Sequence, residues 1–157
     1  VMLASPTARA TIVRWVTEWY ETHIVFRYAG EDAPGEMPRY ELGELPEGFV
    51  ENLESQFVGT GMTAHFYENE KGDVILFEYI YMQQGSLSGV NTENAYVISV
   101  IVNDCEGLLV IPKEEDSNSM LMWLDPEHDL QFTLDAPLGQ EDILNMAESV
   151  HLVETMK

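Results

Sequence analysis

Basic residues are scarce in this chain. Its 157 residues include 7 lysines and arginines against 28 aspartates and glutamates, which gives a formal net charge of −21. A nucleic-acid binder needs basic side chains to displace counterions from phosphates, so this balance excludes nucleic acid as a partner. It also disfavours docking on an anionic lipid surface. The acids are spread along the whole chain, which favours a solvated, self-repelling surface over a dedicated acidic binding face.

Cysteine and long apolar runs are scarce as well. Cys105 is the only cysteine, so no intrachain disulfide can form. No histidine or lysine stands next to it in the sequence to lower its pKa, and we predict a buried, inert thiol. Every apolar run is far shorter than the ~20 residues that a membrane-spanning helix requires. The 157 residues therefore predict a globular domain with no membrane helix of their own.

The sequence also lacks the spacings that mark catalytic or metal sites. Its four histidines occur in four different predicted elements, which gives no support for zinc, and we expect surface or hydrogen-bonded side chains: His23, His65, His128 and His151. Asp125, Glu127 and Asp129 form a weak candidate cluster for calcium, but without the glycine and terminal glutamate of a calcium loop a solvated turn is favoured. We predict no cofactor and no catalytic residue. A carboxylate pair for glycoside hydrolysis depends on spatial separation, so the sequence leaves it open.

The N-terminal part has the spacing of an amphipathic helix. Ser5-Pro6 is a typical helix start, and the following apolar residues recur at helical intervals: Ile12, Trp15, Val16, Trp19 and His23. This pattern predicts a helix over about residues 6–22, with Trp15 and Trp19 as core anchors.

Alternating, β-branched and aromatic residues dominate the middle of the chain. They predict strands near residues 24–28, 49–58, 62–68, 73–82, 96–102, 105–112, 120–124 and 130–134. Both faces of the strand at 73–82 are apolar, which indicates a central position. Gln83 to Asn91 is rich in Gln, Gly and Ser and is predicted as a loop; Leu87 stands where a nucleophile elbow would need serine.

The C-terminal stretch predicts the closing helix. Glu141 and Asp142 suit its first turn, and an apolar face follows, so we expect a helix over about residues 139–151. Short turns force antiparallel pairing of neighbouring strands. The prediction is a single α+β domain over residues 1–157, with a curved antiparallel sheet of about eight strands (about 24–135) and an N-terminal and a C-terminal helix packed on it. The remaining expected anchors are Phe49, Gly107 as a close approach or bulge, Trp123, Phe132 and Ala147.

Several of these motifs resemble a known family. The strand at 96–102, the Asn103 turn with Glu106-Gly107, the strand ending in Trp123 and the closing helix from Glu141 are similar to the bacterial domain-of-unknown-function family 4367, and Leu45-Pro46-Glu47-Gly48-Phe49 is similar to its entry motif. The resemblance implies an extracytoplasmic domain at the C-terminal end of a membrane-anchored, anti-sigma-factor-like protein. It brings no catalytic residues. Since the chain begins with Val1, we expect an upstream segment, and the resemblance places the membrane helix there.

Two functional hypotheses follow. The first is a non-enzymatic sensing or interaction domain outside the membrane, with an unknown protein or small ligand as its partner. The second is a small ligand-binding or hydrolytic domain that uses a pocket between sheet and helices, motivated by the tyrosines and carboxylates on strands. An intracellular acidic scaffold is a third, weaker alternative.

Overall fold

The fold centres on one large antiparallel sheet. The computed structural model describes residues 15–19, 23–28, 38–59, 61–81, 87–125 and 127–153, with the backbone alone for 15–19, 23–28 and 87–90. The sheet has eight strands: β4 (Val50–Glu51), β5 (Phe57–Val58), β6 (Met62–Glu68), β7 (Val74–Tyr81), β9 (Ala95–Val102), β10 (Cys105–Pro112), β11 (Ser119–Asp125) and β12 (Leu130–Ala136). Their order is β4-β6-β7-β12-β11-β10-β9, and β5 pairs with β6 beside β4. The predicted antiparallel sheet of about eight strands is confirmed.

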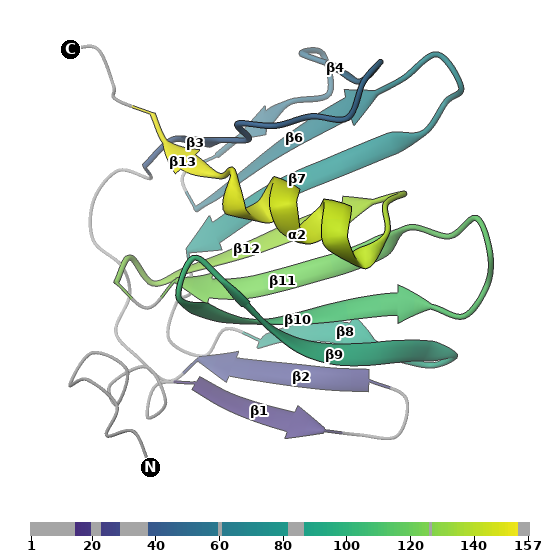
Figure 1. The fold of residues 1–157 in the computed structure, drawn as a ribbon. Helices are drawn as coiled ribbons and strands as arrows, with labels where there is room; N and C mark the ends of the chain where they lie inside the picture. The colour runs from purple at the N-terminus through teal and green to yellow at the C-terminus, as the bar shows by residue number, and fades with distance from the viewer. Residues whose placement is uncertain are drawn as a thin grey trace.

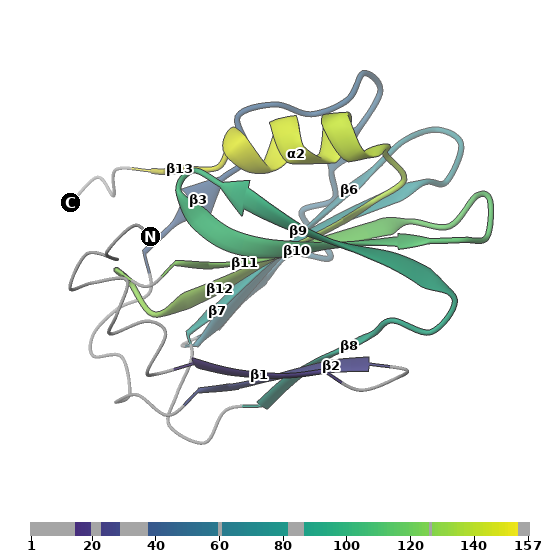
Figure 2. The same ribbon diagram turned by 60° about the horizontal axis from the view of Figure 1, so that its bottom comes forward.

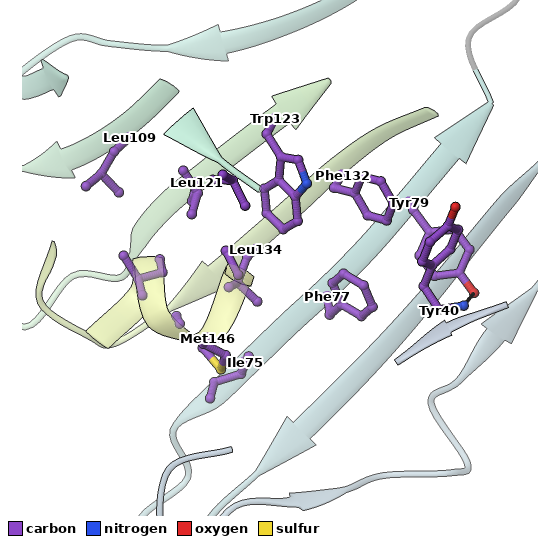
Figure 3. Close-up of a cluster of buried hydrophobic side chains, with 14 of the residues drawn as sticks. Tyr40, Ile75, Phe77, Tyr79, Leu109, Leu121, Trp123, Phe132, Leu134 and Met146 are labelled. Carbon is purple, nitrogen blue, oxygen red and sulfur yellow. Dashed lines mark hydrogen bonds between the residues drawn. The ribbon is translucent and has the colours of Figure 1, made fainter. Parts of the chain in front are cut away.

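Strand alternation sends one set of side chains into the main core. Trp123 pairs with Phe132 across β11 and β12, and Leu134 pairs with Phe77 across β12 and β7, so their side chains share a face. Helix α2 (Gln140–Glu148) lies across this face and buries Ile143, Met146 and Ala147 against it (Figure 1). Figure 3 shows this core, with the aromatic rings in a row beside the helix.

The second face of the large sheet is also apolar. Leu108, Val110 and Met122 are buried there. A three-stranded sheet, in the order β1-β2-β8, lies on the side opposite α2 (Figure 2). Its strands are β1 (Trp15–Trp19), β2 (His23–Tyr28) and β8 (Leu87–Asn91). The large sheet is therefore the middle layer of the fold.

The predicted N-terminal helix is wrong where the structure describes it, because residues 15–19 form β1. β1 pairs with β2 in a hairpin register that runs from Trp15 opposite Tyr28 to Trp19 opposite Ile24. The spacing of Trp15, Val16 and Trp19 satisfies a helical period, but Trp15, Thr17 and Trp19 also alternate at period two. Bulky aromatic and β-branched residues favour a strand once a partner strand is available. Residues 6–14 and 20–22 lie outside the described part.

Other predicted boundaries also change. The strand at 49–58 is two short pieces, β4 and β5, and part of the predicted loop at 83–91 is strand β8, which pairs with β2. The helix predicted at 139–151 ends at Glu148, because the chain then forms β13 (His151–Leu152) against β3 (Tyr40–Glu41). The strands predicted from 62 to 82 and from 96 to 134 are confirmed within one or two residues. Among the described residues, no helix has the length and apolar character needed to cross a bilayer.

Candidate functional site

An open groove lies between residues 44–46 and helix α2. Its volume is about 280 Å³, and it is lined by Glu44, Leu45, Pro46, Leu138, Asp142, Asn145 and Met146. The loop wall ends in a tight turn, in which Phe49 N–H donates to the Pro46 carbonyl at 3.3 Å and Gly48 takes a φ of +88°. Glycine adopts this backbone conformation without steric cost. The helix wall is the exposed flank of α2.

Ser149 ties the loop wall to the end of α2. The Gly43 N–H donates to the Ser149 carbonyl at 3.0 Å, and the Glu44 N–H donates to the Ser149 hydroxyl, also at 3.0 Å. A Cβ at Gly43 would lie 2.8 Å from the Ser149 carbonyl oxygen, so the close approach requires glycine. The pairing of β13 with β3 joins the same two segments. Contacts within the chain therefore hold the groove walls in place before any ligand binds.

The groove has an apolar floor and an acidic rim. Met146 is buried, and Leu45, Pro46 and Leu138 complete the apolar lining, whereas Glu44 and Asp142 are exposed. No lysine or arginine lines it. The groove can therefore accept hydrogen bonds and positive charge at its rim and apolar groups at its floor.

A second polar arrangement is buried inside the large sheet. His65, on β6, is 2% exposed, and its Nδ1 lies 2.6 Å from the Glu51 carboxylate on β4. Its ring stacks on Phe77 with the centroids 6.0 Å apart. Its Nε2 is buried and has no hydrogen-bond partner. Sequence reasoning missed this pair, because Glu51 and His65 are fourteen residues apart and only strand pairing brings them together.

The family described as "Domain of unknown function (DUF4367)" matches residues 39–150, which include the whole large sheet and α2. The chain belongs to this family. The resemblance predicted from the sequence is thereby confirmed. Neither the curated proteins nor the solved structures yield a match.

Five of the expected anchors lie in or against the main core of the DUF4367 domain. Trp123 is 4% exposed and stacks on Phe132 with the centroids 5.1 Å apart. A Cβ at Gly107 would lie 2.6 Å from the Met122 carbonyl oxygen. The two strands can therefore approach this closely only with glycine at position 107. Ala147 is fully buried, and Phe49 packs partly buried against the same cluster. Trp15 and Trp19 lie at the two ends of β1, and their side chains are outside the described part.

The candidate calcium cluster of the DUF4367 domain is a hydrogen-bonded turn. One Asp125 carboxylate oxygen accepts from the Glu127 N–H at 3.0 Å, and the other lies 2.9 Å from Nδ1 of His128. Both carboxylate oxygens of Asp125 thus take part in hydrogen bonds within the turn. In the described residues no three His, Cys, Asp or Glu side chains are grouped to hold a metal.

Tyr40 and Cys105 are the shifted groups near that turn. Burial, with the nearby Asp125 carboxylate, raises the pKa of Tyr40 to about 12. Burial, again with Asp125, raises the pKa of the Cys105 thiol to about 11. Tyr40 packs edge-on against Tyr79, whose hydroxyl accepts from the Tyr40 N–H at 3.1 Å (Figure 3). Both groups are therefore held neutral near pH 7, which suits packing rather than nucleophilic chemistry.

Proposed function

We propose that this chain is a non-enzymatic sensing or protein-interaction domain on the extracytoplasmic side of a membrane-anchored bacterial protein. A regulatory role of the anti-sigma type is the most specific form of the proposal. The location and the anchor, in a segment outside these 157 residues, come from the resemblance described above. The interaction role has its own support in the surface of the domain.

One observation carries the interaction role. Of the nine large apolar side chains exposed in the described residues, five fall between residues 45 and 58: Leu45, Val50, Leu53, Phe57 and Val58. Exposed apolar residues scattered singly are ordinary, and the gathering of five of them along one segment of the sequence is what supports an interaction role for that segment. This segment forms one wall of the groove and continues into the edge strands β4 and β5. A partner that covers it would remove this apolar surface from water.

Site-specific photo-crosslinking tests this surface. A photo-crosslinking amino acid is placed at Leu45 or at Val50 of the full-length protein in its producing cells. The matched control is the exposed Glu115 in the β10–β11 turn. We expect a discrete, heavier protein product from the first two positions and none from the control. Irradiation that gives no product at Leu45 and Val50, or the same product at all three positions, contradicts the proposal.

Protease treatment of intact cells tests the location. The domain should be digested by an externally added protease while a cytoplasmic marker stays whole. Digestion that requires cell lysis contradicts the extracytoplasmic placement and leaves the crosslinking result to stand alone.

The groove itself favours a second candidate, a small-ligand-binding domain. Its apolar floor and the polar groups of Glu44, Asp142 and Asn145 are the usual ingredients of a ligand site. Native mass spectrometry of the protein purified from its own cells tests this. A bound small molecule that is absent from the Asn145→Trp variant, which fills the groove from its rim, would favour this candidate over the interaction domain.

A further inference from the structure

We infer that the groove between residues 44–46 and α2 receives a lysine or arginine side chain from a basic and apolar segment of the partner protein. The inference rests on the proposed interaction function and adds the chemistry of the partner. It is carried by three properties of the groove: its charge, its shape and its preformed walls.

The lining of the groove carries acidic side chains and no lysine or arginine. Glu44 stands on the loop wall and Asp142 on the helix wall, and both are exposed. No lysine or arginine occurs between Tyr40 and Glu70, the stretch that supplies the loop wall. None occurs between Glu114 and Met156, the stretch that supplies the helix wall. A cation that enters the groove therefore meets two carboxylates, and no lysine or arginine among the lining residues competes with it.

The shape of the groove fits a long side chain with a charged end. At about 280 Å³ it lies just below the ~300–1,000 Å³ typical of pockets for drug-sized ligands. Leu45, Leu138 and Met146 offer an apolar floor. Lysine and arginine bury their methylene stems along apolar surface and keep the charged head in water, which matches this floor and rim.

The walls are set before binding. The Ser149 hydroxyl accepts from the backbone N–H groups of Gly43 and Glu44 and so fixes the loop wall, and β13 pairs with β3 directly before this wall. A partner therefore does not have to order the loop, so less of the contact energy is spent on immobilisation.

A protein segment fits better than a free amine or a second copy of the chain. One exposed ion pair contributes little by itself, so a lone amine would be held weakly. A segment can add apolar contacts at Leu45, Pro46 and Leu138 along the groove lining. Two copies of a chain with net charge −21 repel each other and can supply few cations.

A peptide titration tests the inference. The probe is a capped hexapeptide of alternating lysine and leucine. Its binding is followed by the chemical-shift changes of the backbone amides in NMR spectra of the whole 157-residue chain. We expect the shifts to concentrate at residues 43–46 and 138–146 and the binding to weaken as salt is raised, because the rim is exposed. The Glu44→Gln/Asp142→Asn double variant should bind about tenfold more weakly. The Glu114→Gln/Glu115→Gln variant changes the net charge equally, outside the groove, and should bind within about twofold of the parent.

Four outcomes would overturn the inference. The control variant weakens binding as much as the groove variant, which indicates attraction to net charge only. The same peptide with glutamine in place of lysine binds equally well. n-Butylamine binds as tightly as the peptide, which indicates a small-amine site. Sedimentation shows a dimer, and the groove amides shift in NMR spectra as the dimer forms. Crosslinks at Leu45 together with a failed titration would refute this inference and leave the proposed interaction function intact.

Discussion

Replacing Trp123 with alanine should remove the largest side chain of the main core. Trp123 is 4% exposed, lies on β11 and stacks almost flat on Phe132, with 9° between the ring planes. On the adjacent strand Gly107 leaves room for it, with a would-be Cβ only 3.0 Å from the Trp123 Cβ. The ring is thus enclosed by its neighbours, and a small shift of one neighbour cannot fill the cavity that its removal would leave.

The size of the loss can be worked out from this environment. A buried aromatic side chain removes about 150–250 Å² from water, which at ~25 cal/mol per Å² is worth about 4–6 kcal/mol as an upper bound. Measured tryptophan-to-alanine changes in cores cost about 3–5 kcal/mol, cavity included. For a domain of this length each kcal/mol lowers Tm by about 2–4 °C. Trp123→Ala should therefore lower Tm by about 6–20 °C.

Thermal unfolding followed by far-UV circular dichroism measures this change. Trp123→Phe keeps an aromatic ring against Phe132 and should lose less than half as much. Tyr96→Ala is the matched surface control, because Tyr96 is 60% exposed and the Lys113 ammonium group lies 5.0 Å from its ring centre. It should lose about 1 kcal/mol or less. A Tm for Trp123→Ala within about 3 °C of the parent would refute the enclosed position of the ring.

Three further predictions concern titration. Burial raises the pKa of the Glu78 carboxyl in the folded protein. The protonated carboxyl therefore favours the folded state at pH values below the pKa of the unfolded chain, and this stabilisation is lost as pH rises through the pKa of the folded protein. In urea unfolding, Glu78→Gln should be more stable than the parent at pH 7 and equally stable near pH 4. The raised pKa of Tyr40, about 12, means that stability is lost between about pH 10 and 12, and Tyr40→Phe should remove one late-titrating phenol from the tyrosinate absorbance curve. Cys105, with a pKa of about 11, should react with iodoacetamide at pH 8 on the order of 100-fold more slowly in the folded protein than in urea.

The sequence predicts the C-terminal half of the fold well because its local signals agree. From β9 to β12 each strand is a mainly apolar run or alternates, and each connection is a short polar turn, so pattern and turn chemistry favour the same pairing. Asn103 and Asp104 both take positive φ in the β9–β10 turn, as hairpin turns of this kind require. The start of α2 follows from its acidic first turn. Its end does not, because β13 forms only where β3 is present to pair with it.

The N-terminal part and the polar pair could not be predicted in the same way. Trp15, Val16 and Trp19 satisfy two periods at once, and the strand is decided by the pairing of β1 with β2, which no local pattern contains. The approach of Glu51 to His65 depends on the register of β4 on β6, where Glu51 stands opposite Tyr67. The groove likewise joins residues about a hundred positions apart, and its only local signal was the Leu45–Gly48 turn.

The fold shows where the few described basic residues lie relative to the groove. Among the residues whose side chains the structure describes, the basic ones are Arg39, Lys71 and Lys113. Arg39 lies 3.4 Å from Glu41, and Lys113 lies over the Tyr96 ring. None of the three lines the groove. Under the proposed interaction function, a partner segment that brings its own cations would offset the repulsion between the carboxylates at the rim, and this is how the acidic surface would favour a basic protein segment.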